Sequence, residues 1–308
     1  MGGFTRRKAL LTGATAVSAF AAGPFAATRD KPADAAGPFA ATAEKQGSQA
    51  SGPIVTRGRL KQSVSRWCYG KIPMPEFCDA VKGMGLTAMD LLNDTEWPIA
   101  ADHGLITSMA YAGGGSIPDG LNNKANHDKI LKGFEDGIPK AAKYKIPNVI
   151  TFFGNRRGVS DAEATDNCIE GLNKIKHLGE ENNVTICVEL LNSKVDHKDY
   201  QGDHTAFGVN IVKAVNSPRV KLLYDAYHMQ IMEGDLIRTL RANKDWIAHV
   251  HTGGVPGRHE LDDTQEVTWK AIATALVDMG FGGFMAHEFV PTRDPLTSLR
   301  EAVALCDV

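Results

Sequence analysis

The 308-residue chain has only five cysteines, and no two of them have the CxxC spacing of a zinc knuckle or a redox pair. An odd, scattered set does not form a disulfide framework either, so a metal ion would have to be held by His, Asp or Glu side chains. The chain also lacks an excess of positive charge, because 34 Lys and Arg stand against 36 Asp and Glu and the formal net charge is −2. A dedicated nucleic-acid binder needs a basic surface to neutralise phosphates, so nucleic acid is not an expected partner.

A long uninterrupted apolar run is missing as well. The mild apolar stretch 9–27 contains Pro24 and two glycines and is short for a bilayer span, so stable membrane insertion is not expected. Arg6 and Arg7 directly precede this stretch. A twin arginine before a weak apolar run is typical of a twin-arginine export signal. A frayed, alanine-rich tail and a membrane anchor are the alternative interpretations.

A short duplication marks the end of this region. The string GPFAAT occurs at residues 23–28 and again at 37–42, which indicates a low-complexity linker up to about residue 53. We therefore predict two parts, a signal and linker over 1–53 and a folded domain over 54–308. We expect the protein to be exported through the twin-arginine pathway to the periplasm or the extracellular space.

Beyond the linker, short apolar segments alternate with longer amphipathic ones. Continuous apolar strands separated by helices of about ten residues or more are typical of parallel strands covered by helices. Eight such units over about 250 residues predict a single (β/α)8 TIM barrel. A doubly wound open sheet is the alternative, but no predicted strand is followed by a GxGxxG motif or a P-loop. The predicted strands are 60–67, 86–92, 105–110, 148–153, 184–190, 220–224, 246–251 and 283–289, and the predicted helices are 75–84, 97–103, 124–144, 161–182, 204–215, 235–243, 267–279 and 296–306.

Ionisable residues end the last four predicted strands, at the barrel edge where such folds place their chemistry. These residues are Glu189, Asp225, His251 and Glu288. A single acid at such a position is at least as often a helix cap or a solvated loop residue, but four on consecutive strands indicate a shared site. We expect His249 to face the opposite side of its strand, and we therefore assign His251, which is nearer the carboxyl end.

Three neighbouring carboxylates repel one another and stay ionised together only beside a cation. Three oxygen donors and one imidazole suit Mg²⁺ or Mn²⁺ best, with Co²⁺ or Zn²⁺ as further candidates. The predicted cofactor is therefore a divalent metal ion, and its predicted ligands are Glu189, Asp225, His251 and Glu288.

Two strings of the sequence carry a family resemblance. Residues 224–236, YDAYHMQIMEGDL, resemble a signature of hydroxypyruvate isomerases, and residues 254–260, GVPGRHE, resemble the loop after the seventh strand in the same family. From about residue 60 to 306 the chain is similar to the xylose isomerase-like barrel superfamily, which includes ketose 3-epimerases, endonuclease IV and hydroxypyruvate isomerase. The resemblance implies a metal site at the four strand ends, with Glu189 and Glu288 as the paired acid and base.

The resemblance also implies an activity, the interconversion of hydroxypyruvate and tartronate semialdehyde, or of a related small keto or aldehyde sugar acid, by enediol proton transfer. Arg258 would then bind a substrate carboxylate and His228 a substrate oxygen. The alternatives are a solvated loop arginine and a histidine that orients Asp225.

Two other functions stay open on the sequence. A ketose 3-epimerase would use the same metal and carboxylates, but these enzymes usually carry another acid shortly after the fifth-strand glutamate, where residues 192–196 read NSKVD. A DNA-repair endonuclease would need more ligands and a basic face, both of which are missing. The non-enzymatic alternative is an exported sugar-binding barrel. The expected partner is in each case a small keto acid or sugar, and a homo-oligomer is compatible with the sequence.

Overall fold

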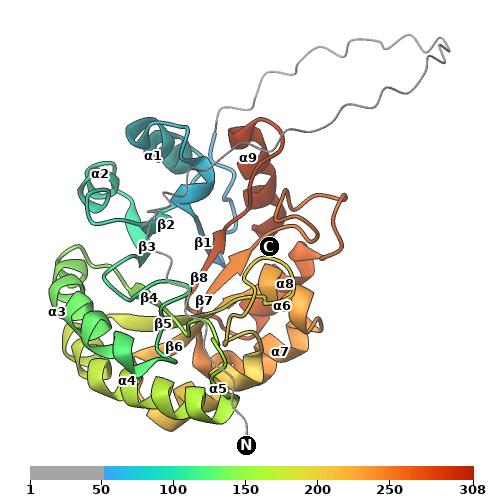
Figure 1. Ribbon diagram of the computed structural model, residues 1–308. Coiled ribbons are helices and arrows are strands. Elements are labelled where there is room, and N and C mark those ends of the chain that lie inside the picture. Colours follow the sequence, from blue (N-terminus) through green and yellow to red (C-terminus); the bar gives the residue numbers. More distant parts are fainter. Residues whose placement is uncertain (1–51) are drawn as a thin grey trace, which may run out of the picture. The chain divides into compact units, whose positions relative to one another are not determined.

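Eight parallel strands surrounded by helices make up the part of the chain that the computed structural model describes, residues 52–308 (Figure 1). The predicted (β/α)8 TIM barrel is confirmed. The predicted export signal at Arg6 and Arg7 lies outside the described residues, as does nearly all of the predicted linker, so export stays a prediction.

The strands are β1 (Lys61–Val64), β2 (Ala88–Leu92), β3 (Ile106–Ala110), β4 (Asn148–Phe152), β5 (Thr185–Leu190), β6 (Val220–Asp225), β7 (Ile247–Thr252) and β8 (Phe284–His287). The helices are α1 (Met74–Gly83), α2 (Trp97–Asp102), α3 (His127–Lys143), α4 (Asp161–Asn182), α5 (Thr205–Val215), α6 (Ala226–Met232), α7 (Leu236–Asn243), α8 (Trp269–Asp278) and α9 (Pro295–Cys306), with short 3-10 helices η1 (Arg66–Tyr69), η2 (Lys124–Asn126) and η3 (Lys244–Trp246).

The strands pair in the order β1-β8-β7-β6-β5-β4-β3-β2. Strands that follow one another in the sequence are therefore paired throughout, except at the seam between β1 and β2. At that seam a parallel bridge between Ser65 and Asp90 brings β1 to β2. Strand β2 is irregular there, because its register against β3 shifts on both sides of Asp90.

Helices cover the outer face of the sheet, and the strands are therefore buried on both sides. All residues of β4 and β5 are buried, which explains why these segments read as continuous apolar runs rather than alternating ones. Helix α3 turns Ile130, Phe134 and Ile138 toward the strands, at the four-residue spacing of one helix face. Each such side chain contributes about 1.5–3 kcal/mol by leaving water.

One helix is absent from the sequence prediction. Helix α6 follows β6 without a loop, whereas the prediction has only the later helix over 235–243 in this region. Asp225 is the N-cap of α6, and its Oδ1 accepts a hydrogen bond from the backbone N–H of His228 at 3.0 Å. This helix has seven residues and follows the strand directly, so its sequence is too short to show the apolar periodicity from which a helix is predicted.

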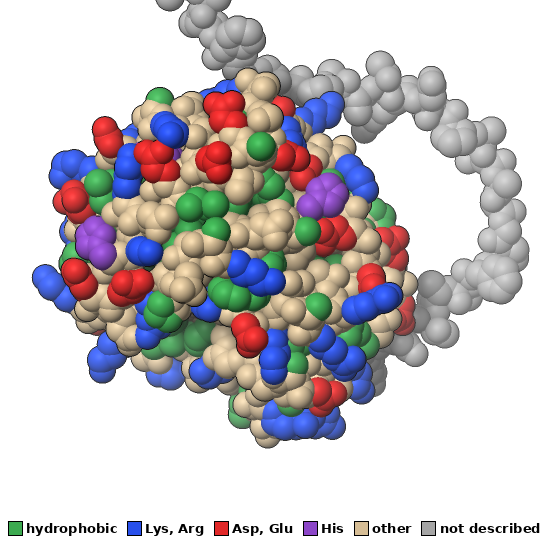
Figure 2. All heavy atoms as spheres, turned by 90° about the horizontal axis from the view of Figure 1, so that it is seen from below, with side chains coloured by type: hydrophobic (Ala, Val, Ile, Leu, Met, Phe, Trp, Pro, Cys, Tyr) green, Lys and Arg blue, Asp and Glu red, His purple; other side chains and the backbone are tan. Residues whose placement is uncertain are grey.

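The surface shows charges of both signs. On the face drawn in Figure 2, the Lys and Arg side chains are interspersed with Asp and Glu. Within residues 52–308, every helix is too short or too polar to cross a bilayer.

The first and last described segments meet. The Asp307 carboxylate accepts hydrogen bonds from the backbone N–H groups of Thr56, Arg57 and Gly58 at 2.7–2.9 Å. The carbonyl of Val308 accepts one from Nε of Arg59 at 2.7 Å. The segment that leads into β1 therefore lies beside the segment that follows α9.

Candidate metal and catalytic site

The structure brings the four strand-end residues together. Glu189 of β5, Asp225 of β6, His251 of β7 and Glu288 just after β8 offer ligand atoms that all lie within 4.8 Å of one another. All four side chains are buried. Adjacent parallel strands end at the same barrel edge, and this is why residues up to 99 positions apart in the sequence converge there.

The surroundings of His251 show whether this cluster suits a metal ion. Its Nδ1 is buried without a hydrogen-bond partner, yet it lies 2.5 Å from Oε2 of Glu288, 3.5 Å from Oε1 of Glu189 and 3.8 Å from Oδ2 of Asp225. Buried polar atoms are rarely left unpaired. A divalent cation beside Nδ1 would satisfy this nitrogen and the three carboxylates at once, so the donor set fits the predicted cofactor.

The predicted orientation of His249 is wrong. Its ring lies on the same side of β7 as that of His251, with the two ring centroids 5.1 Å apart. Residues two positions apart on a strand point to the same face, so both histidines face the barrel interior. His249 is one layer deeper, beneath the site, and is fully buried.

Arg258 lies inside the acidic cluster. Its NH2 group donates to Oδ2 of Asp225 at 2.7 Å and to Oε2 of Glu288 at 2.5 Å. Its backbone has a left-handed φ of +57°, and its Nε donates to the Glu288 carbonyl at 3.1 Å, so the loop after β7 is tied to the end of β8. The sequence assigns Arg258 to a substrate carboxylate, whereas here it pairs with two protein carboxylates. One guanidinium leaves an excess of negative charge among three acids, which a divalent ion would neutralise.

His228 stands between this arginine and the loop after β5. NH1 of Arg258 donates to its Nε2 at 2.5 Å, and Nδ2 of Asn192 lies 2.6 Å from its Nδ1. Burial lowers the pKa of His228 to about 3, so the ring is neutral and has one acceptor nitrogen for two donors. The ring also lies 3.7 Å from Oδ2 of Asp225. The structure therefore places His228 next to Asp225 and on the cavity wall, where both predicted roles are accessible to it.

The two glutamates have different surroundings. Burial raises the pKa of Glu189 to about 7. Burial would raise the pKa of Glu288 too, but Arg258 and His251 hold it below its ordinary value. Nε1 of Trp67 also donates to Oε1 of Glu288 at 2.5 Å, so N–H donors contact both oxygens of that carboxylate. The cluster thus contains one tightly held anion and one carboxyl that titrates near neutral pH.

A cavity of about 350 Å³ opens over these residues. Glu189, Glu288, His228 and Arg258 line its charged side. Apolar and aromatic side chains also line it, namely Leu91, Tyr111, Ile117, Ile150 and Phe152. This size and this mixture suit a small polar molecule with one less polar face.

Three cavity residues were missed in the sequence. Trp67 lies in η1, shortly after β1, and its 47 % exposure shows that it is a wall residue rather than the core residue that a tryptophan usually is. Tyr111 directly follows β3 and lines the same cavity. Asp196 also lines the cavity, so an acid does follow the fifth strand. Its Oδ2 accepts from Tyr227 Oη at 2.9 Å and from Asn192 Nδ2 at 2.7 Å. The available signal for the first two was their place at strand ends.

Glu260, the last residue of the GVPGRHE string, holds the neighbouring loops. Its buried carboxylate accepts hydrogen bonds from the backbone N–H and the hydroxyl of Thr292 at 2.8 and 2.9 Å, and from Ser298 Oγ at 2.9 Å. It therefore connects the loop that carries Arg258 to the segment that follows Glu288.

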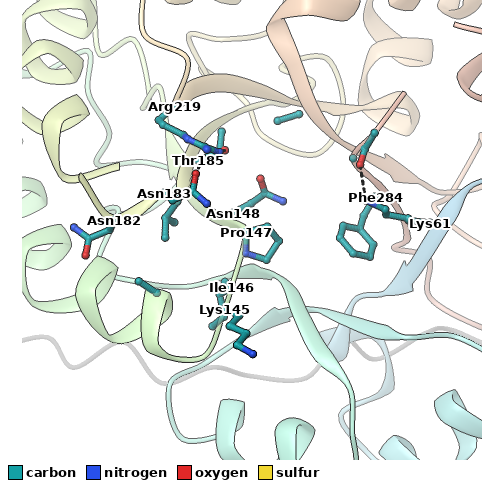
Figure 3. Close-up of a pocket in the computed structure, with 15 residues that line it drawn as sticks. Lys61, Lys145, Ile146, Pro147, Asn148, Asn182, Asn183, Thr185, Arg219 and Phe284 are labelled. Carbon is teal, nitrogen blue, oxygen red and sulfur yellow. Dashed lines mark hydrogen bonds between the residues drawn. The ribbon is translucent and has the colours of Figure 1, made fainter. Parts of the chain in front are cut away.

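A second cavity, of about 490 Å³, opens at the amino ends of the strands, at the other end of the barrel. Figure 3 shows Lys61 and Phe284 on one side of it and Thr185 and Arg219 across from them. Lys61 donates to the Gly282 carbonyl at 3.0 Å, and Arg219 donates to Asn183. Its lining includes none of the predicted site residues, so the candidate chemistry belongs to the smaller cavity.

The chain resembles known proteins over most of its length. The family described as "Xylose isomerase-like TIM barrel" matches residues 70–307. A mouse (Mus musculus) protein named "Putative hydroxypyruvate isomerase" is 25% identical over 262 residues, which cover 78% of this chain and 92% of that protein. The D-psicose 3-epimerase of Agrobacterium fabrum is 27% identical over 209 residues, covering 63% of this chain and 68% of the epimerase.

Solved structures show the same fold. The crystal structure titled AP endonuclease, family 2, from Brucella melitensis superposes with a TM-score of 0.70 at 21% sequence identity. The superposition covers 78% of this chain and 96% of that one.

Proposed function

The chain belongs to the xylose isomerase-like TIM barrel family, and from this premise we propose that it is a metal-assisted isomerase or epimerase of a small keto sugar or keto acid. One observation carries the proposal: two carboxylates, Glu189 and Glu288, line a single small cavity and also lie beside the buried Nδ1 of His251, which has no hydrogen-bond partner. An enzyme that moves a proton at a carbon next to a carbonyl needs an acid and a base on the two sides of its substrate.

In this mechanism, Glu189 and Glu288 transfer the proton between neighbouring carbons through an enediol. Two N–H donors, from Trp67 and Arg258, hold Glu288. Glu189 lies 3.5 Å from Nδ1 of His251, so we assign the first proton abstraction to Glu189. A bound divalent ion, held by the four strand-end residues, would supply a Lewis acid for the substrate oxygens. Arg258 and His228 line the same cavity and orient the substrate.

For the substrate we propose hydroxypyruvate, interconverted with tartronate semialdehyde, or a closely related small keto or aldehyde sugar acid. The YDAYHMQIMEGDL string and the coverage of 92% of the mouse relative support this choice. A second candidate is ketose 3-epimerisation. Asp196 favours it, because this acid lines the cavity after the fifth strand, where ketose epimerases usually carry one.

Proton exchange in D₂O tests the proposal. Metal-loaded protein is incubated with hydroxypyruvate or with D-psicose, and incorporation of deuterium and product formation are followed by NMR. We expect exchange with at least one substrate, and the substrate that is also converted identifies the reaction. Exchange with neither substrate, in Mg²⁺, Mn²⁺ or Co²⁺, would reject the enediol mechanism in favour of a sugar-binding barrel.

Variants then locate the proton carriers. Glu189→Gln and Glu288→Gln each keep an oxygen for a metal but lose the ability to carry a proton, so each should lower turnover about 10²–10⁴-fold. The double variant should be little worse than the worse single one, because residues that act as a unit are not additive. Glu266→Gln, at an exposed position in the loop after β7, is the control. Near-parental turnover of both single variants would contradict the assignment.

A further inference from the structure

A second group of titratable side chains lies directly beneath the site. Asp90 of β2 is fully buried, as are His249 and His251, which face it from β7. Oδ2 of Asp90 lies 2.9 Å from Nε2 of His251, in hydrogen-bond geometry. Oδ1 of Asp90 lies 3.1 Å from Nε2 of His249, but that nitrogen has no hydrogen-bond partner. His251 therefore has the hydrogen-bond geometry toward this carboxylate, and His249 lies beside it as a close ion-pair contact.

Other contacts fix the orientation of the carboxylate. Ser108 Oγ donates to Oδ1 of Asp90 at 2.6 Å, and Ser65 Oγ to Oδ2 at 3.4 Å. Ser65 also forms the backbone bridge to Asp90 at the seam of the barrel. With neighbours on both oxygens and no exposure, the carboxylate has a single orientation toward β7.

The backbone of β2 is distorted at this point. Leu91 has a φ of +52°, and the register against β3 shifts on both sides of Asp90. A leucine in the left-handed region costs about 1–2 kcal/mol. The distortion directs two consecutive residues toward the site, because Asp90 contacts His251 and Leu91 lines the cavity. In a regular strand consecutive side chains point to opposite faces.

We propose that Asp90 is a positioning residue that fixes the tautomer and the ring orientation of His251 for metal binding. An ionised carboxylate only accepts hydrogen bonds, so in a neutral, metal-bound His251 the proton would lie on Nε2 and the lone pair of Nδ1 would be free for an ion held among the three carboxylates. The inference rests on the metal site of the proposed function and adds a residue outside its four ligands. Partners of this kind typically change metal affinity by about 10–100-fold.

Co²⁺ titration of the full chain, followed by the visible absorption of the bound ion, tests this role. Asp90→Asn keeps the volume of the side chain but removes its charge, and its amide can donate where the carboxylate only accepts. We expect its Kd for Co²⁺ to rise about 10–100-fold. Thr151→Val is the matched control, because Thr151 is a fully buried residue of β4, which pairs with β3 and β5 rather than with β7, and its hydroxyl donates to the Gly114 carbonyl at 2.6 Å. Its Kd should stay within twofold of the parent's.

The outcomes separate two failures. A parent chain that binds no Co²⁺ rejects the metal site itself and this inference with it. A parent that binds Co²⁺ and an Asp90→Asn variant with an unchanged Kd reject only the role of Asp90.

A measurement on the parent covers the case in which Asp90→Asn does not fold. In ¹⁵N-histidine NMR of the Zn²⁺-loaded protein, His251 should show a protonated, slowly exchanging Nε2 and a metal-shifted Nδ1. Metal binding through Nε2 would overturn the proposal.

Discussion

Replacing Glu260 by glutamine removes one negative charge from a buried position between two loops of the site. Burial alone would raise the pKa of this carboxyl, but the N–H groups of Glu260 itself and of Thr292, together with the hydroxyls of Ser298 and Thr292, outweigh it and lower the pKa to about 2. Glutamine has the same shape, but its amide places donors where Thr292 and Ser298 already donate. Glu260→Gln therefore tests the charge with little change in packing.

The magnitude follows from the lowered pKa. A carboxyl group with a pKa of 4.5 in the unfolded chain and about 2 in the folded protein contributes about 3 kcal/mol to the free energy of unfolding at pH 7. Because the folded-state pKa is depressed, this contribution is fully present above pH 4.5 and is lost as the pH falls toward 2. At pH 3 about half of it, roughly 1.4 kcal/mol, is left.

Urea unfolding of metal-free protein at pH 7 and at pH 3 measures both values. We expect Glu260→Gln to lose about 3 kcal/mol at pH 7 and about half as much at pH 3. Asp263→Asn, at an exposed position in the same loop, should change stability by less than about 0.5 kcal/mol. An equal loss at both pH values, or a loss under about 1 kcal/mol at pH 7, would refute the reasoning.

Three further predictions concern the metal, the cavity wall and export. Adding Mn²⁺ to chelator-treated protein should raise the Tm of the parent but not that of Asp225→Asn. This variant loses a ligand charge but keeps an oxygen for the α6 cap. An unchanged parental Tm would argue against a metal site. Trp67→Phe keeps an aromatic ring but removes the N–H donor to Glu288. A hydrogen bond to a charged group is worth about 1.5–3 kcal/mol, so kcat should fall about 10-fold or more with a smaller change in KM. A kcat within twofold of the parent's would show that this donor is not used. Replacing Arg6 and Arg7 together by lysine should leave the protein in the cytoplasm on cell fractionation, and secretion at the parental level would contradict the twin-arginine prediction.

The barrel was predictable from the sequence because buried parallel strands are apolar throughout. Strands β4 and β5 show this directly, and their charged or polar neighbours mark where each strand ends. The convergence of Glu189, Asp225 and His251 followed from the same rule, since parallel strands end at one edge. Helix α6 was not predictable in this way, because it begins at the residue directly after the end of β6.

The layer below the site needed the structure. Asp90 stands in the string AMDLL, where a lone acid within an apolar strand gives no indication of its partner 161 residues away. The mistaken orientation of His249 could have been avoided, because the two-residue period of a strand already places it on the face of His251. The contact of Arg258 with Asp225 depends on a left-handed backbone at a non-glycine residue, for which the sequence carries no signal.

The hydrogen bonds between Asp307 and residues 56–58 make the described chain, in effect, a ring that has been cut once. The entry to β1 and the exit from α9 are already adjacent, so a short linker from Val308 to about residue 54 would join them without displacing either. A circular permutant opened at an exposed turn between a helix and the next strand would then keep every strand beside its present neighbours. The order in which the chain visits the strands is thus separable from the arrangement that the site requires, in which the four predicted ligands come from the neighbouring ends of β5, β6, β7 and β8.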